Sequence, residues 1–326
     1  MALLVHTLWA YSGAVAVNAG LAALGGGAIA AGGLGMAGGA ALVTGLFGAA
    51  GAGLAGYKMS KRTGAIQEFS FELLGGKGMH TFIAVSGWLS EKNDFSKTWE
   101  ALNQVANGGE RYALRWESKH LLALGKALGT FTTQKVTHAA VKAWAMRASR
   151  VAAKAVRWPS LVLDAFRFID NPWSIARDRA EKGGRELALL LKERVHGHRP
   201  VTLIGFSLGS RLIFHALEAL AEEKALGIVD HAILMGSAVT AEANRWNNVR
   251  PVVAGRLVNA YSISDWVLGI LYRTTQMTTQ VAGLSPIDSP HVENVDVTHI
   301  ARGHLDYHKN VAELLTVIGV DGVGSV

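Results

Sequence analysis

Short apolar runs alternate with amphipathic stretches along most of this chain, and no other feature restricts its fold as strongly. The runs, many of them β-branched, lie at residues 81–85, 112–116, 201–204, 228–235, 256–263 and 292–300. Stretches with apolar residues at helical spacing occur at residues 99–105, 208–225 and 305–317. Strand–helix units repeated in this way build a mostly parallel sheet with helices on both faces. The sequence therefore predicts an α/β fold.

The first 57 residues differ from the rest because they contain no Asp, Glu, Lys or Arg. Residues 9–56 are rich in Gly and Ala, and small residues recur at a spacing of four, which lets two helices approach closely in lipid. One membrane crossing needs about 20 residues, so this length allows two passes. We expect a membrane-type helical hairpin over residues 1–57. The alternative is a flexible glycine-rich tail, although such segments carry Ser rather than Ala, Leu and Val.

The remaining domain, residues 58–326, contains a helical insertion at residues 118–198 with a strongly basic first half. No acidic residue occurs at 118–163. The basic residues in this stretch are Lys119, Lys126, Lys135, Lys142, Arg147, Arg150, Lys154 and Arg157. They are compatible with an ordinary solvated face or with a docking element at an anionic membrane surface. The chain has a net charge of +7 but no recognisable nucleic-acid-binding module, so we do not expect nucleic acid as a partner.

The motif Gly205-Phe206-Ser207-Leu208-Gly209 is the strongest candidate for chemistry. Alone it is a weak signal in a chain with 38 glycines. Its position between an apolar run and an amphipathic stretch strengthens it, because a strand-to-helix turn exposes a serine hydroxyl and requires small flanking residues. Ser207 is therefore the predicted nucleophile. The backbone N–H of Leu208 is the first predicted oxyanion donor.

A second oxyanion donor is expected from the loop after an earlier strand. Residues 86–89 occupy that place. The N–H of Trp88 is the first choice and that of Leu89 the second. The alternative is an ordinary tight turn at Gly87.

The acid and base of a serine triad follow the serine in chain order, each after a later strand. Asp265 and His304 satisfy this order. A histidine can take the serine proton and return it near neutral pH, and an aspartate orients the ring. The competing candidates are His299 and His308 for the base, and Asp288 and Asp296 for the acid.

The chain has no cysteine, which excludes disulfides, thiol catalysis and thiolate metal sites. Its other histidines, such as His6, His80, His196 and His198, have no acidic residues at metal-ligand spacing. We expect neither a metal nor a cofactor.

Several of these segments resemble the transmembrane and coiled-coil domain-containing protein four family. The resemblance is carried by residues 85–89, 203–211, 259–268, 271–273 and 303–307. It implies an α/β-hydrolase fold, a triad of Ser207, Asp265 and His304 beside glycine-rich membrane segments, and lipase- or phospholipase-like activity. The chain differs from the family in having its glycine-rich segment at residues 9–56, without an acidic coiled-coil segment before it.

These features together predict a serine carboxylester hydrolase, a lipase, phospholipase or esterase, that works through an acyl-enzyme at a membrane. Its expected partners are an acyl-lipid or other ester substrate and an anionic membrane surface. One alternative is a membrane-inserting toxin or tethering protein whose glycine-rich hairpin is the active part. Another keeps the triad but uses a thioester or peptide as the acyl donor.

Overall fold

The computed structural model describes residues 66–92, 94–106, 108–133, 160–276 and 280–320. The chain divides into two units, Met1–Tyr57 and Lys58–Val326, and all the described residues belong to the second. The expected hairpin at 1–57 and the basic residues at 135–157 lie outside the described part. Within the described ranges, no helix has the length and apolar character needed to cross a membrane.

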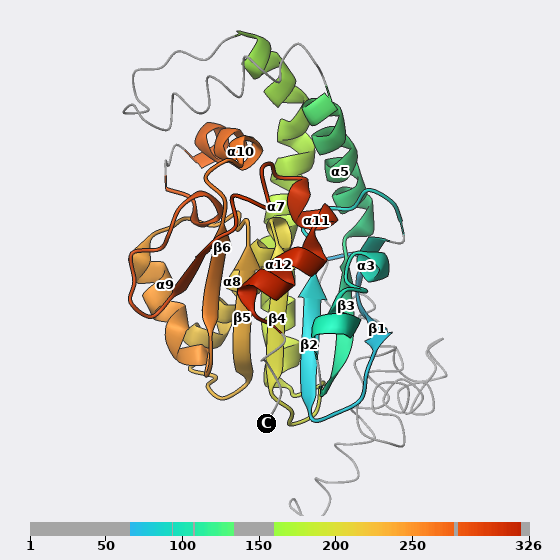
Figure 1. The fold of residues 1–326 in the computed structure, drawn as a ribbon, viewed down its shortest axis with the longest axis vertical. Coiled ribbons are helices and arrows are strands. Elements are labelled where there is room, and N and C mark those ends of the chain that lie inside the picture. The colour runs from blue at the N-terminus through green and yellow to red at the C-terminus, as the bar shows by residue number, and fades with distance from the viewer. Residues whose placement is uncertain (1–65, 93, 107, 134–159, 277–279, 321–326) are drawn as a thin grey trace, which may run out of the picture. The chain divides into compact units, whose positions relative to one another are not determined.

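A seven-stranded sheet forms the centre of the described domain, in the order β1-β3-β2-β4-β5-β6-β7 (Figure 1). The strands are β1 (Phe69–Gly75), β2 (His80–Val85), β3 (Gly109–Trp116), β4 (Val201–Phe206), β5 (Val229–Met235), β6 (Leu257–Tyr261) and β7 (Glu293–Asp296). Only β1 runs antiparallel to its neighbour, and the other pairs are parallel. The prediction of an α/β fold with a mostly parallel sheet is confirmed.

Helices cover both faces of this sheet. They are α3 (Asp94–Lys97), α4 (Leu102–Val105), α5 (Ser118–Thr133), α7 (Ser160–Lys192), α8 (Leu208–Glu222), α9 (Ala243–Val249), α10 (Trp266–Gln276), α11 (Asp306–Lys309) and α12 (Val311–Ile318), with short 3₁₀ turns η3 (Arg250–Val252) and η4 (Ala282–Leu284). In Figure 1, α12 crosses in front of the sheet while α7 and α8 pack together behind it. The central strands β2 and β4 are therefore buried along their whole length.

The structure corrects several boundaries that were expected from the sequence. Strand β1 was not predicted, although its first residues alternate between the buried Phe69 and Phe71 and the half-exposed Ser70 and Glu72. The strand expected at 292–300 ends at Asp296, where a turn closed by the N–H of Ile300 and the carbonyl oxygen of Val297 follows. The helix expected at 99–105 begins only at Leu102, and the last helix is divided at Asn310 into α11 and α12.

Candidate active site

The chain turns sharply from β4 into α8 at Ser207, whose φ of 55° and ψ of −122° lie outside the usual regions for a non-glycine residue. Such a conformation costs about 1–3 kcal/mol and persists only where the surroundings impose it. The flanking glycines permit the turn. A Cβ added at Gly209 would lie 2.0 Å from the carbonyl oxygen of Val85, and one at Gly205 would lie 2.9 Å from the carbonyl carbon of Gly209. Glycine is therefore sterically required at both positions that flank Ser207 in this turn.

The structure brings the three predicted triad residues together in one hydrogen-bonded chain. The Oγ of Ser207 lies 2.7 Å from Nε2 of His304, and Nδ1 of His304 lies 2.6 Å from Oδ2 of Asp265. Asp265 follows β6 and His304 follows β7, so all three stand at the carboxyl ends of strands. The other carboxylate oxygen of Asp265 accepts the N–H of Leu268 at 3.0 Å, in the first turn of α10. This bond fixes the carboxylate toward His304.

The competing acids and bases lie elsewhere. His299, Asp288 and Asp296 are exposed, and Asp296 accepts the N–H of Thr298 at 2.9 Å. His308 is half-buried, and its Nε2 lies 2.9 Å from Oγ1 of Thr98. Ser207 is hydrogen-bonded to His304, and His304 to Asp265, so the geometry of the described residues supports these two over the alternatives.

The loop after β2 lies directly against the turn at Ser207. A Cβ on Gly87 would come within 2.3 Å of the carbonyl oxygen of Phe206 and 2.6 Å of the backbone nitrogen of Leu208. Glycine is thus needed for this close approach. The N–H of Leu89, the second choice for an oxyanion donor, donates to the carbonyl oxygen of Leu121 at 3.2 Å. The contact with α5 occupies that amide and favours Trp88 as the second donor.

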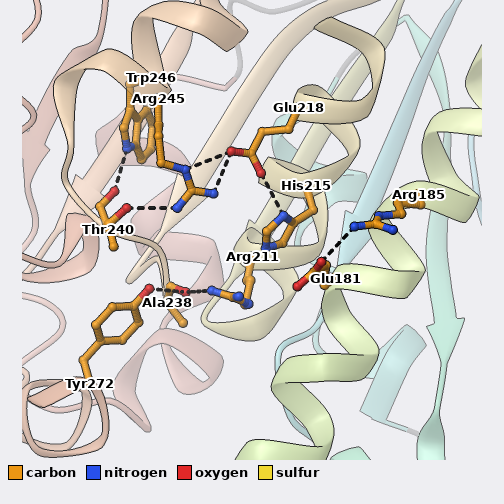
Figure 2. Close-up of polar contacts among 10 residues, drawn as sticks. All are labelled: Glu181, Arg185, Arg211, His215, Glu218, Ala238, Thr240, Arg245, Trp246 and Tyr272. Carbon is orange, nitrogen blue, oxygen red and sulfur yellow. Dashed lines mark hydrogen bonds and ion pairs between the residues drawn. The ribbon is translucent and has the colours of Figure 1, made fainter. Parts of the chain in front are cut away.

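Two residues for which the sequence predicted no role connect α8 to α10 (Figure 2). The Nη1 of Arg211 donates to the carbonyl oxygen of Ala238 at 3.1 Å, and the hydroxyl of Tyr272 donates to the same oxygen at 3.2 Å. Burial lowers the pKa of Arg211 and raises that of Tyr272. Both residues belong to segments that carry the family resemblance, which was the only sequence signal for them. They link the helix that follows the nucleophile to the helix that follows Asp265.

A second network holds the same helix about two turns further along, as Figure 2 shows. Glu218 accepts hydrogen bonds at 2.9 and 2.6 Å from Nε and Nη2 of Arg245, and its other oxygen lies 2.8 Å from Nδ1 of His215. Burial acts to raise the pKa of Glu218, but the hydrogen bonds from His215 and Arg245 outweigh it and lower the pKa. Arg245 also donates to Oγ1 of Thr240 at 3.0 Å. Helices α8 and α9 are thereby joined beside the end of β5.

Among the residues that the structure describes, no group of three or more His, Asp or Glu is arranged to hold a metal ion. His80, for example, lies with Nε2 2.8 Å from Oγ1 of Thr202, inside the sheet. His198 is exposed, and the ring nitrogens of His196 are buried. His6 lies outside the described residues. The described geometry thus offers acid–base and nucleophilic groups at a single place, the ends of β4, β6 and β7.

Sequence comparison identifies the family. The pattern of the family described as a protein of unknown function, DUF726, matches residues 5–321. The chain belongs to the DUF726 family. It is 41% identical over 271 residues to the transmembrane and coiled-coil domain-containing protein STS1 of Oryza sativa subsp. japonica, covering 81% of this chain and 40% of that protein. The predicted resemblance is confirmed at the level of the family.

Other DUF726 relatives carry different descriptions. An uncharacterised membrane protein of Caenorhabditis elegans is 41% identical over 278 residues, covering 82% of this chain and 45% of that protein. The probable lipase MIL1 of Saccharomyces cerevisiae is 33% identical over 273 residues, covering 82% of this chain and 25% of that protein. The chain spans less than half the length of these relatives.

Proposed function

We propose that this chain is a serine carboxylester hydrolase of the α/β-hydrolase fold that acts on acyl lipids at a membrane. The observation that carries the proposal is the hydrogen-bonded chain from Ser207 through His304 to Asp265. It begins at a residue in a strained conformation directly before a 15-residue helix. A serine held this way between a strand and a helix, with a histidine and a carboxylate in line, is the arrangement that activates a hydroxyl as a nucleophile.

The proposed reaction proceeds in two halves. His304 takes the proton from Oγ of Ser207 as the oxygen attacks the ester carbonyl carbon, and the backbone N–H groups of Leu208 and Trp88 stabilise the resulting oxyanion. The C–O bond to the leaving alcohol then breaks, and His304 returns the proton to that alcohol, which leaves an acyl group on Ser207. Water then attacks the acyl carbon while His304 takes a proton from it, the bond from that carbon to Oγ of Ser207 breaks, and His304 returns the proton to Oγ as the acid leaves. Asp265 stabilises the imidazolium in both halves.

The choice of a lipid substrate rests on the relatives and on the composition. One relative is named a probable lipase, and two others are named as transmembrane or membrane proteins. In this chain, residues 1–57 contain no charged side chain and residues 118–163 no acidic one. An apolar segment and a basic segment together suit an anionic bilayer surface. No cofactor is needed for this chemistry.

Access to the nucleophile requires movement in the proposed enzyme. Ser207 and Asp265 have 0% exposed surface and His304 has 1%. An ester carbonyl has to reach Oγ of Ser207 within about 3–3.5 Å to react. Side chains over the triad must therefore shift before a substrate binds, and contact with a lipid surface would supply the apolar environment for that shift.

The test compares the full chain with matched variants on p-nitrophenyl butyrate and on phospholipid vesicles. We expect the variants S207A and H304A to lose at least about 10³-fold in kcat. The variant H299A, which removes an exposed histidine from the same region, should retain wild-type turnover. A fluorophosphonate probe should label Ser207 in the wild type, as mapped by mass spectrometry. Equal turnover by wild type and S207A would refute the proposal.

Dye leakage from the same vesicles separates this function from membrane insertion. Leakage that persists in S207A but disappears when residues 1–57 are deleted would favour an insertion activity of the glycine-rich segment. Hydrolysis that depends on Ser207, without leakage, supports the esterase.

A further inference from the structure

The loop that follows β2, residues 86–91, is fixed at both ends but not by the backbone of Trp88 itself. At its start, the indole N–H of Trp99 donates to Oγ of Ser86, and that of Trp116 donates to the carbonyl oxygen of Ser86, both at 3.0 Å. At its end, the N–H groups of Ser90 and Glu91 donate to Oδ2 of Asp94 at 2.7 and 2.8 Å. Between these anchors, the N–H of Leu89 donates to the carbonyl oxygen of Leu121 at 3.2 Å, and the side chain of Trp88 adds a further restraint on the position of that residue.

That side chain is held between rings. The imidazole of His308 stacks on the indole of Trp88, with centroids 4.6 Å apart and planes at 28°. The ring of Phe206, next to the nucleophile, meets Trp88 edge-on at 6.2 Å and His308 edge-on at 6.1 Å. Trp88 is 4% exposed. Ring contacts of this geometry add to the restraint that burial supplies, so His308 helps to fix the position of the Trp88 ring.

The same imidazole also contacts the group that closes the loop. Its Nε2 lies 3.4 Å from Oδ2 of Asp94 and 2.9 Å from Oγ1 of Thr98. Asp94 is 4% exposed, and the hydroxyl of Ser90 donates to it as well. Burial lowers the pKa of His308, so the ring is neutral at pH 7. These polar contacts fix the plane of the ring, and the ring in turn fixes Trp88.

His308 lies one helical turn after His304, on α11. The segment that supplies the base for Ser207 therefore also contacts the loop that supplies the second oxyanion donor. We propose that His308 is a positioning residue that holds the N–H of Trp88 in place through the stacked ring, and so couples the oxyanion site to the segment carrying His304. This inference rests on the proposed function, because it assigns His308 a part in the same hydrolysis.

The experiment measures turnover of p-nitrophenyl butyrate and backbone hydrogen exchange in the full chain. H308L removes the ring and should lower kcat about 10- to 100-fold, while KM stays within about twofold of the wild-type value. This loss of kcat is no larger than the loss expected when an oxyanion donor is removed. H308F keeps a ring against Trp88 and should retain kcat within about threefold. H308Q keeps a polar group near Thr98 and Asp94 without a ring, and should behave like H308L. H299L is the matched control and should resemble the wild type.

Backbone hydrogen exchange tests whether His308 restrains the loop without relying on catalytic activity. In H308L and H308Q, amides of residues 86–91 should exchange about tenfold faster, while those of β4 and β5 keep their protection. Unchanged exchange and kcat in both variants would overturn the inference. So would equal loss of kcat in H308F and H308L, or a rise in KM with kcat unaltered. If the wild type shows no turnover that depends on Ser207, the proposed function fails, while exchange in residues 86–91 still decides whether His308 holds the loop.

Discussion

His196 provides a quantitative test of how burial affects stability in this fold. It lies between α7 and β4, is 0% exposed, and neither ring nitrogen has a hydrogen-bond partner among the described residues. Burial, followed by the positive charges of Arg194 and Arg199, lowers its pKa from 6.5 to about 4. The neutral ring is compatible with this site, but the imidazolium is not.

The direction of the pH effect follows from this pKa. The unfolded chain binds a proton at His196 below pH 6.5, whereas the folded chain binds it only near pH 4. The free energy of unfolding therefore falls as the pH falls from 6.5 toward 4. One pKa unit corresponds to about 1.4 kcal/mol, so the full loss is about 3 kcal/mol, and most of it is complete at pH 4.5.

The measurement is urea unfolding of the full chain at pH 7.5 and pH 4.5, followed by circular dichroism. The variant H196F cannot titrate at this position, so between the two pH values it should lose about 2–3 kcal/mol less than the wild type. The variant H299F removes an exposed histidine from another part of the chain and should lose as much as the wild type. Equal acid losses in H196F and wild type would refute the reasoning, whatever the stability of H196F at pH 7.5.

Three further predictions concern the site and its supports. G209A places a Cβ 2.0 Å from the carbonyl oxygen of Val85 and should reduce fluorophosphonate labelling at least about 100-fold. G129A is the matched control, because among the described residues no atom outside the adjoining helix backbone lies within 4 Å of the added Cβ, and it should raise the free energy of unfolding by about 0.5–1 kcal/mol. D265N should lower kcat by about 10⁴, measured with p-nitrophenyl butyrate, because the amide favours the wrong tautomer of the histidine. Y272F removes the hydrogen bond to Ala238 and should cost about 1 kcal/mol in urea unfolding.

The features of this protein that could be predicted from its sequence are those that depend on the local pattern of apolar, polar and glycine residues. The strand before Ser207 and the helix after it follow from a β-branched run and a helical period, and the flanking glycines follow from the turn between them. The order of Ser207, Asp265 and His304 follows from the succession of strands. These features depend on neighbours in the chain, and the structure brings the three side chains together.

Features that depend on distant segments could not be predicted. Strand β1 is a short edge strand that forms by pairing with β3, where Phe69 lies opposite Trp116, and its alternation covers only five residues, Phe69 to Leu73. The choice between Trp88 and Leu89 as the proposed second oxyanion donor depends on a distant group, because the carbonyl oxygen of Leu121 accepts the N–H of Leu89. His304 and His308 lie one helical turn apart, and only tertiary packing directs one toward Ser207 and the other onto a tryptophan ring.

The long sequence separations within the triad have a consequence for the protein during its synthesis. The contacts from Ser207 to His304 and from His304 to Asp265 span 97 and 39 positions, and the histidine follows β7, the last strand added to the edge of the sheet. On the proposed mechanism, a ribosome-bound chain that ends before residue 304 has a serine but no base to activate it. If the proposed activity holds, it begins only after the last strand of the sheet has been made, so a partly synthesised chain would not hydrolyse the lipids around it.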